Sequence, residues 1–252
     1  MSERERDYQK IVKDGYDKIA SRYDEYRDIF DNEAELKEFM RLVKPGGHIL
    51  DAGCGSGVVA RFLVDSGFQV TGIDISQKMI DISKHRTPEA ELIVGDMTAI
   101  EFDNETFDSI ASAYALFHIP RTRHFNLFLT FHQILKKGGA LLFSIGSKEI
   151  DATDGIWRWE EFQSVPMYWN YYPPSKTVEL LKSANFQIVF SRNIEETEGI
   201  HHWIIAKALK ESRPDACTVV ISTHRWILST SQDVNNMIIL NSSILISKVM
   251  VK

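Results

Sequence analysis

The sequence is short of several features that would assign it to particular classes of protein. Only two of its 252 residues are cysteine, Cys54 and Cys217, so neither a disulfide framework nor a zinc site is expected. Acidic residues outnumber basic ones, and the net charge of −6 argues against a general nucleic-acid or anionic-membrane surface. No run reaches the roughly 18 apolar residues that span a bilayer. The charged N-terminus also lacks the apolar core of a signal peptide. We therefore expect a cytoplasmic protein with no metal, no nucleic-acid partner and no membrane partner.

The sequence does contain a regular alternation of strand and helix patterns. Hydrophobic residues make up 44% and charged residues 25%, as in an ordinary soluble domain. Strands are predicted at 49–50, 68–74, 91–94, 107–113, 140–145, 186–191 and 201–208. Helices are predicted at 4–30 (one helix or a broken pair), 32–43, 58–66, 77–87, 122–135 and 175–184, with Ser76 and Ser175 as N-caps. This alternation predicts a parallel sheet with helices on both faces and an antiparallel hairpin of the last two strands at its edge.

The chain is organised around residues 48–57, which read HILDAGCGSG. A strand, a glycine-rich turn and a helix form the opening unit of a nucleotide-binding α/β domain, and glycine lets the backbone approach a ligand closely. The dinucleotide pattern G-x-G-x-x-G is not met. Asp51, just ahead of the turn, would repel a pyrophosphate but attract a cation such as an amino-acid ammonium. The turn therefore favours a ligand that carries an ammonium group.

Acidic residues also stand at the ends of the next two predicted strands. Asp74 follows Gly53 by 21 positions, the spacing of an acid that binds ribose hydroxyls. Asp96 is suited to accept a hydrogen bond from an adenine amino group, and Ile75, Met79 and Met97 are suited to sandwich the adenine ring. The carboxyl ends of parallel strands meet at one crevice, so these residues should converge. A ligand with an ammonium, a ribose and an adenine is S-adenosylmethionine.

Five motifs together carry a family resemblance over about residues 8–208. They are LDAGCGSG at 50–57, VTGIDIS at 70–76, VGDM at 94–97, FDSIASAYALFHIP at 107–120 and LKKGGALLFSI at 135–145. The chain resembles the class I S-adenosylmethionine-dependent methyltransferases, specifically the small-molecule subgroup of the type 11 or type 25 domain. The resemblance implies a Rossmann-like, doubly wound α/β fold with a seven-stranded sheet of order 3-2-1-4-5-7-6 and strand 7 antiparallel. It also implies that the N-terminal helices act as a lid.

The resemblance and the strand-end pattern together give the expected cofactor site. The residues expected to bind S-adenosylmethionine are Tyr16, Tyr23, Asp51, Ala52, Gly53, Cys54, Gly55, Gly57, Asp74, Ile75, Met79, Asp96, Met97, Ala113 and Tyr114. Asp51 and the glycines would contact the methionine part, and Ala113 with Tyr114 would lie under the sulfonium.

The acceptor side depends on His118 and on an aromatic insertion at 147–174. His118 is the candidate catalytic base, and the alternative is a histidine that only fixes its loop. The residues expected to contact the acceptor are Phe117, His118, Trp157, Tyr168, Trp169 and Tyr172. An aromatic cluster that merely packs over the sheet is the alternative for the insertion. If it lines the site, a planar or apolar acceptor is favoured over a sugar or a free amino acid.

Two domains follow from these assignments. Residues 1–210 form the methyltransferase domain, with 1–44 as the helical lid and 147–174 as the substrate cover, and residues 211–252 form a tail of unknown role. Three interpretations of the stretch from residue 216 onward stay open: extra strands, an exchange arm between subunits, or sequence unrelated to the fold.

The expected reaction is in-line transfer of a methyl group to a small-molecule acceptor, by a monomer or a homodimer. The alternatives are a cofactor-binding protein without transfer activity and an NAD-dependent oxidoreductase. The identity of the acceptor, and the atom that is methylated, stay open.

Overall fold

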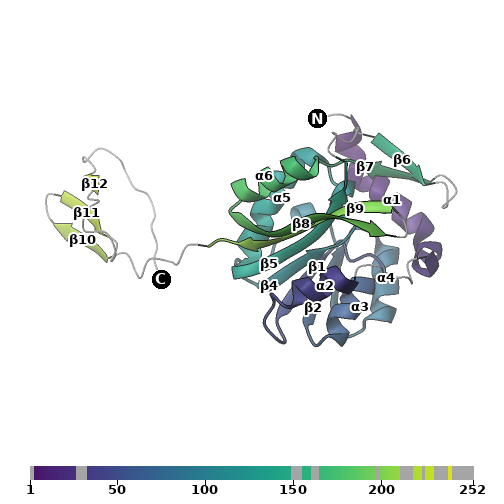
Figure 1. Cartoon of the computed structure of the whole chain (residues 1–252), viewed down its shortest axis with the longest axis horizontal. Helices are drawn as coiled ribbons and strands as arrows, with labels where there is room; N and C mark the ends of the chain where they lie inside the picture. The colour runs from purple at the N-terminus through teal and green to yellow at the C-terminus, as the bar shows by residue number, and fades with distance from the viewer. Residues whose placement is uncertain are drawn as a thin grey trace. The chain divides into compact units, whose positions relative to one another are not determined.

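The structure is a computed structural model of the full chain, shown in Figure 1. It describes residues 3–26, 33–148, 155–159, 165–196, 199–210, 218–222, 225–229 and 238–239. The chain divides into two compact units, Met1–Lys210 and Glu211–Lys252. Within the described ranges, no helix has both the length and the apolar character needed to cross a bilayer.

A seven-stranded sheet forms the centre of the first unit. Its order is β3-β2-β1-β4-β5-β9-β8. The first five strands in this order pair in parallel, whereas β9 pairs antiparallel with both β5 and β8. Numbered among themselves along the chain, these strands have the order 3-2-1-4-5-7-6, so the predicted fold is confirmed. The strands are β1 (His48–Ala52), β2 (Gln69–Asp74), β3 (Glu91–Val94), β4 (Phe107–Ser112), β5 (Leu135–Gly146), β8 (Phe186–Glu196) and β9 (Gly199–Ala208).

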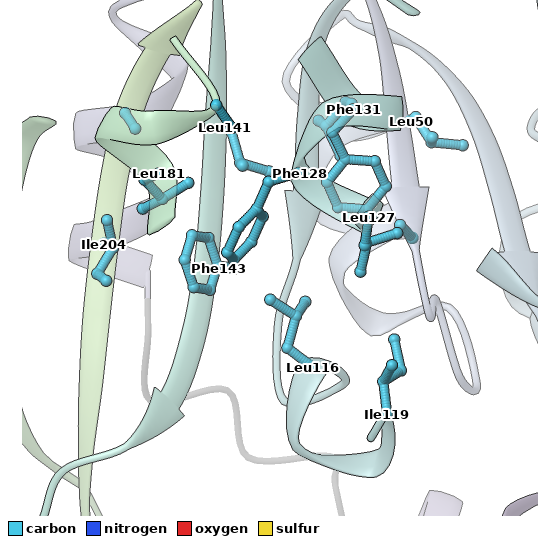
Figure 2. Packing of buried hydrophobic residues seen from close by; sticks show 14 of the residues in the cluster. Leu50, Leu116, Ile119, Leu127, Phe128, Phe131, Leu141, Phe143, Leu181 and Ile204 are labelled. Atoms are coloured by element: carbon cyan, nitrogen blue, oxygen red, sulfur yellow. The ribbon is translucent and has the colours of Figure 1, made fainter. Parts of the chain in front are cut away.

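Helices cover both faces of this sheet because successive strand residues point to opposite faces. Leu50, Leu141 and Ile204 belong to one hydrophobic cluster, while their neighbours Ile49, Leu142 and Ile205 belong to another. Figure 2 shows the first cluster, where the aromatic rings of α5 and the leucine of α6 meet the sheet. The helices are α1 (Glu3–Tyr26), α2 (Glu33–Met40), α3 (Val58–Asp65), α4 (Gln77–Arg86), α5 (Arg121–Ile134) and α6 (Pro174–Ser183), with short 3-10 turns at Met97–Ala99 and Leu116–His118.

Several local predictions differ from the structure. The N-cap of α6 is Pro173, with Pro174 inside the first turn, so the assignment of Ser175 as the cap is wrong. Proline fixes φ near its helical value and lacks the N–H that a first turn would leave unpaired. The turn expected at 136–139 lies inside β5 as a register shift, where Gly138 has a φ of 73°.

The aromatic insertion also contains strands that its sequence did not predict. β6 (Gly155–Trp159) and β7 (Val165–Trp169) pair antiparallel, and β7 packs against α1. Gly15 of α1 makes this contact close, because a Cβ at that position would come within 2.6 Å of Met167 Sδ. The hairpin therefore supports the N-terminal helix.

The second unit contains a small antiparallel sheet of its own. Its strands are β10 (Thr218–Ser222), β11 (Arg225–Ser229) and β12 (Ile238–Ile239), in the order β10-β11-β12.

Candidate functional site

The carboxyl ends of the parallel strands open into a hollow of about 1070 Å³, counting the part that is open to solvent. Helix α1 contributes to its wall, together with the turns that follow β1, β2, β3 and β4. The predicted cofactor residues that line it are Tyr16, Tyr23, Asp51, Gly53, Cys54, Gly55, Asp74, Ile75, Asp96, Met97, Ala113 and Tyr114. Ala52 and Met79 are buried and do not line it, and Gly57 caps the start of α3.

The glycine turn takes a conformation that other residues rarely adopt. Gly53, Gly55 and Gly57 have φ values of 81°, 51° and 84°. A Cβ on Gly53 would come within 2.4 Å of the Ala115 side chain, so this position also needs glycine for space. The Gly53 and Cys54 amides both donate to the carbonyl of Ile73, at 2.8 and 3.0 Å. The turn is thereby fixed to the end of β2.

Asp51 places a buried carboxylate beside this turn. The residue is 1% exposed, and its Oδ2 has no hydrogen-bond partner among the described residues. Burial, together with the charge of Asp74, raises the pKa of Asp51 to about 7. A buried polar atom without a partner is rare, because losing its hydration is costly. This oxygen therefore fits a cationic ligand group such as an ammonium.

Asp74 ends β2 and accepts two backbone hydrogen bonds. Its Oδ2 accepts from the Gly55 amide at 2.9 Å, and its Oδ1 accepts from the Ser76 amide at 2.8 Å. Burial raises the pKa of Asp74 to about 6, although both of these hydrogen bonds lower it. Each carboxylate oxygen has a further lone pair, so the oriented carboxylate fits a pair of hydroxyl donors.

Asp96 connects the wall of the hollow to α1 through hydrogen bonds that its sequence position did not predict. Its carboxylate accepts from Tyr8 Oη at 2.9 Å and from the amide and hydroxyl of Thr98, both at 2.8 Å. Gln9 Nε2 is a further donor. Burial, and then the charge of Asp96, raise the pKa of Tyr8 to about 12. Asp96 therefore holds α1 in place as well as lining the hollow.

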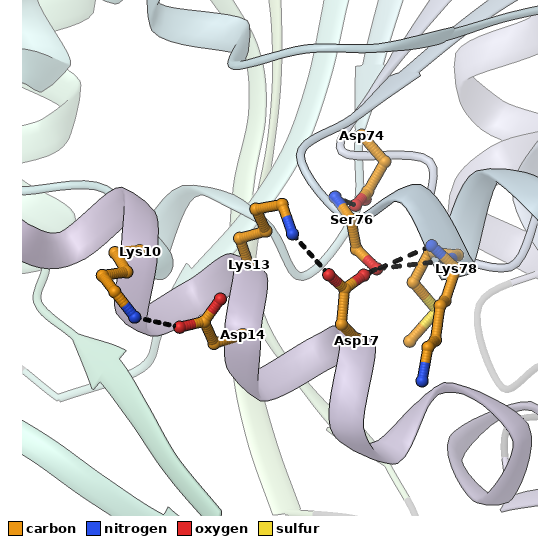
Figure 3. Close-up of polar contacts among 8 residues, drawn as sticks. Lys10, Lys13, Asp14, Asp17, Asp74, Ser76 and Lys78 are labelled. Atoms are coloured by element: carbon orange, nitrogen blue, oxygen red, sulfur yellow. Dashed lines mark hydrogen bonds and ion pairs between the residues drawn. The ribbon is translucent and has the colours of Figure 1, made fainter.

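Helix α1 is also bound to the start of α4, as Figure 3 shows. Asp17 Oδ1 accepts from Ser76 Oγ at 2.6 Å and from the Lys78 amide at 3.2 Å, and Lys13 pairs with the other oxygen at 2.6 Å. Ser76 is the N-cap of α4, as predicted, because its side chain accepts from the Met79 amide. Ser76 therefore links Asp74, the carboxylate suited to ribose hydroxyls, to Asp17 of α1.

Tyr16 and His118 form a hydrogen-bonded pair in the wall of the hollow. Tyr16 Oη lies 2.7 Å from His118 Nε2, and His118 Nδ1 lies 2.8 Å from the carbonyl oxygen of Tyr168. A carbonyl only accepts, so Nδ1 carries the proton and Nε2 accepts from the tyrosine hydroxyl. Burial lowers the pKa of His118 to about 4, and the histidine is therefore neutral near pH 7.

Tyr114 lies in the wall of the hollow, and its hydroxyl makes a hydrogen bond. Its φ is 56°, its amide donates to Ser144 Oγ at 2.8 Å and its hydroxyl donates to Glu196 Oε2 at 2.7 Å. His201 Nδ1 and Trp203 Nε1 also bond to Glu196, at 2.8 and 2.5 Å. Burial opposes ionisation, but these three hydrogen bonds lower the pKa of Glu196 below its usual value. The Tyr114 ring is thereby fixed at the hollow.

Most residues predicted to contact the acceptor lie behind this wall. Phe117 stacks on Trp169 at 3.9 Å, and Trp169 meets the edge of His118 at 5.5 Å. Tyr168 is fully buried, and Tyr172 contacts Arg121. Of this set, only His118 lines the hollow; the side chain of Trp157 lies outside the described part of the chain.

Some lining residues were absent from the predicted site. They are Tyr8, Val12, Ser56, Val58, Val59, Ile73, Gly95, Ala115 and Ile119. Tyr8 and Val12 share a helical face with Tyr16 at four-residue spacing, which is the signal that could have found them. In the part of the chain that the structure describes, no three histidine, cysteine or acidic side chains are grouped to hold a metal ion.

Comparisons with known proteins agree with this geometry. Residues 49–139 match the family model described as a methyltransferase domain. The chain is 27% identical over 133 residues to a demethylmenaquinone methyltransferase of Renibacterium salmoninarum, covering 50% of this chain and 55% of that protein. It is 31% identical over 126 residues to a ubiquinone biosynthesis O-methyltransferase of Coxiella burnetii, covering 48% and 53%. The match therefore spans little more than half the length of these curated relatives.

Solved structures share the fold. A 1,6-didemethyltoxoflavin-N1-methyltransferase of Burkholderia thailandensis, solved with its acceptor and S-adenosylhomocysteine, superposes with a TM-score of 0.67 at 15% identity, covering 81% of this chain and 90% of that one. An S-adenosylmethionine-dependent methyltransferase of Methanosarcina mazei superposes with a TM-score of 0.62 at 21% identity, covering 72% and 100%.

Proposed function

We propose that the chain is a class I S-adenosylmethionine-dependent methyltransferase of the type 25 subgroup and that it methylates a small molecule held against Tyr16 and His118. The observation that carries the proposal is one hollow with an unpartnered, buried Asp51 oxygen near the glycine turn and a Tyr16–His118 pair in its wall. S-adenosylmethionine is the cofactor of this family, and when bound it supplies an electrophilic methyl group.

On the cofactor side, each carboxylate has a proposed partner. Asp51 would bind the ammonium, since its Oδ2 lacks any other described partner. Asp74 would accept from the ribose hydroxyls, because two backbone amides already orient it. Asp96 and Met97 would flank the adenine in the part of the hollow nearest Tyr8. The buried charge of Asp51 disfavours a pyrophosphate at the turn and hence an NAD-type ligand.

On the acceptor side, the Tyr16–His118 pair handles the proton. The Tyr16 hydroxyl proton is donated to His118 Nε2, so the Tyr16 oxygen can accept a hydrogen bond from the N–H or O–H of the acceptor. As the acceptor attacks, its proton passes to Tyr16 Oη while the tyrosine proton passes to Nε2. Because burial lowers the pKa of His118 to about 4, the histidine is neutral near pH 7 and its Nε2 is free of a proton before the reaction. The pair also orients the attacking atom.

The N-terminal segment 1–44 is proposed as the lid of this site. Tyr8, Val12, Tyr16 and Tyr23 of α1 all line the hollow, so a ligand there would lie under this helix. The insertion at 147–174 is proposed to brace the lid, because β7 packs on α1 and Tyr168 binds His118.

The proposed acceptor is a planar, largely apolar compound. The wall is rich in aromatic rings, and two curated relatives are named as a demethylmenaquinone methyltransferase and a ubiquinone biosynthesis O-methyltransferase. The structural neighbour from Burkholderia is named for an acceptor called 1,6-didemethyltoxoflavin. These names support a ring-bearing acceptor.

Two measurements test the proposal. Calorimetry should show tight binding of S-adenosylhomocysteine and no response to NADH. Incubation with methyl-deuterated S-adenosylmethionine and a cell metabolite extract should then give a product heavier by one deuterated methyl group. Binding of S-adenosylhomocysteine without any deuterated product would favour a cofactor-binding protein that transfers no methyl group. Tight binding of NADH alone would favour an oxidoreductase.

A further inference from the structure

Glu196, the last residue of β8, lies behind the wall of the hollow and bonds to Tyr114, which lines it. Resting on the proposed function, we propose that Glu196 is a positioning residue that acts through the Tyr114 ring. The pair makes the hollow bind the sulfonium of S-adenosylmethionine more tightly than the neutral thioether of S-adenosylhomocysteine. Such a preference would favour release of the cofactor once its methyl group has been transferred.

Tyr114 has a backbone conformation that bulky residues rarely adopt. Its φ is 56°, and the other non-glycine residues with positive φ in the described ranges, Glu105 and Asn185, are both exposed. A tyrosine in this left-handed region is strained. Strain of this kind persists where surrounding contacts fix the residue, and it is concentrated at functional sites. The conformation of Tyr114 therefore points to a role for the direction of its side chain.

Hydrogen bonds fix Tyr114 at both its backbone and its side chain. Its amide donates to Ser144 Oγ at 2.8 Å, and its hydroxyl donates to Glu196 Oε2 at 2.7 Å. Both partners are buried, and the side chain of Glu196 is 3% exposed. Ser144 lies opposite Trp203 in the pairing of β5 with β9, and Trp203 Nε1 donates to Glu196 Oε1 at 2.5 Å. The two attachments of Tyr114 are thus joined across β5, β9 and β8.

The ring of Tyr114 is also held by the edges of two other rings. Its centre lies 5.1 Å from that of His201 and 5.5 Å from that of Trp203, and both contacts are edge to face. Both of these side chains also bond to Glu196, His201 through Nδ1 at 2.8 Å. One carboxylate therefore organises the hydroxyl of Tyr114 and the two rings that pack against it.

Glu196 places negative charge at the hydroxyl end of the Tyr114 ring. Burial opposes ionisation, but the hydrogen bonds from His201, Tyr114 and Trp203 outweigh it and lower the pKa of Glu196 below its usual value. The side chain is therefore ionised at neutral pH. A hydroxyl that donates to a carboxylate forms a strong hydrogen bond that polarises it, so the ring becomes more electron-rich. An electron-rich aromatic ring attracts a cation more strongly.

The strand order places Tyr114 on the methionine side of the proposed cofactor site. The acids proposed for the adenine, the ribose and the ammonium stand at the ends of β3, β2 and β1: Asp96, Asp74 and Asp51. In the sheet β4 comes next after β1, and Tyr114 follows β4. Its neighbour Ala115 lies so close to Gly53 of the glycine turn that a Cβ on this glycine would come within 2.4 Å. The methionine half of the cofactor, which carries the sulfonium, would therefore lie next to Tyr114.

Calorimetry on the full chain tests this role, and the readout is the ratio of the dissociation constants for S-adenosylmethionine and S-adenosylhomocysteine. Glu196→Gln keeps the size of the side chain but replaces the carboxylate with a neutral amide. S-adenosylmethionine should weaken about fivefold more than S-adenosylhomocysteine in this variant. A residue that only stabilises the fold would weaken both ligands equally, and an unchanged ratio overturns the inference. Glu195→Gln is the matched control, because Glu195 is exposed on the same strand, and it should leave the ratio unchanged.

Tyr114→Phe tests whether Glu196 acts through the tyrosine, because it keeps the ring and removes the hydroxyl that bonds to the carboxylate. It should move the ratio in the same direction, and the double variant should move it no further, since two parts of one interaction are not additive. Additive shifts overturn the inference. If Glu196→Gln does not fold, an unchanged ratio in Tyr114→Phe overturns it. An unmodified chain that binds neither ligand removes the proposed function, whereas binding of both with unmoved ratios in the variants removes only the role of Glu196.

Discussion

A buried carboxylate with an unpartnered oxygen, such as Oδ2 of Asp51, destabilises a folded protein unless a ligand binds it. Asp51 is 1% exposed, and the charge of Asp74 adds to its cost of ionisation. The same isolation makes its oxygen a strong site for a cation in a medium of low dielectric constant. At the scale of the residue, the burial of Asp51 lowers the stability of the free protein and raises its affinity for a cationic ligand.

The first prediction concerns the pH dependence of cofactor binding. An ammonium needs the ionised form of Asp51, and the pKa of this group is raised to about 7 in the free protein. Affinity should therefore be full at high pH and fall as the pH drops through 7. We expect S-adenosylhomocysteine to bind about tenfold more weakly at pH 6 than at pH 8, measured by calorimetry. A pH-independent affinity would contradict the role of Asp51.

The second prediction concerns the stability of the free protein. Because burial raises the pKa of Asp51 to about 7, the folded state binds its proton more tightly than the unfolded state does. The penalty for ionising Asp51 therefore grows as the pH rises from 3.8, the ordinary pKa of an aspartate, and is complete above about pH 7. Asp51→Asn should raise the free energy of unfolding at pH 8 by on the order of 3 kcal/mol while weakening cofactor binding. Thermal melts at pH 5 and pH 8 check the sign, since the gain should shrink at pH 5.

The third prediction separates the two roles open to His118. Tyr16→Phe keeps the ring but removes the hydroxyl that bonds to Nε2 at 2.7 Å. If the pair handles the proton, product formation should fall roughly tenfold to a hundredfold, with S-adenosylhomocysteine affinity nearly unchanged. If His118 only fixes its loop, the variant should melt at a lower temperature yet keep its rate below that temperature.

At the scale of the element, α1 is held by polar contacts from a helix and a strand turn. Asp17 binds the start of α4, and Tyr8 binds Asp96 after β3. The spacing of apolar and aromatic residues in α1 predicts an amphipathic helix, but it does not predict which of these residues line the hollow. The N-cap of α6 is Pro173 and not the predicted Ser175, because proline is also favoured at the start of a helix.

The fourth prediction tests the attachment of α1 to α4. Asp17→Ala removes two acceptor contacts at the start of α4 and an ion pair with Lys13. We expect a loss of about 1–2 kcal/mol in the free energy of unfolding and faster release of S-adenosylhomocysteine. Asp14→Ala is the matched control, because Asp14 pairs with Lys10 on the exposed side of the same helix. Equal effects of the two substitutions would argue against a specific role for Asp17.

At the scale of the whole molecule, all lining residues of the hollow belong to the unit Met1–Lys210. The hydrophobic clusters on both faces of the central sheet also lie within this unit. The proposed division into a domain of residues 1–210 and a tail of residues 211–252 follows this arrangement.

The fifth prediction is that the tail is dispensable for cofactor binding. A chain ending at Lys210 should bind S-adenosylhomocysteine within about twofold of the full chain, because every residue that lines the hollow lies within Met1–Lys210. Calorimetry on both chains, with sedimentation to compare their association states, checks this. A large loss of affinity, or a change from dimer to monomer, would instead support an exchange arm.

The sequence by itself determined the alternation of strands and helices, the glycine turn and the acids at the strand ends, because these depend on hydrophobic period, backbone conformation and short spacings. The order of the strands in the sheet was predicted from the family resemblance. Only the tertiary structure decided which side chains meet across long separations. Tyr16 reaches His118 over 102 positions, and Tyr8 reaches Asp96 over 88. It also decided that Tyr168 is buried behind the wall. Such contacts depend on how closely α1 packs on β7, which the missing side chain of Gly15 permits, and no local pattern encodes that distance.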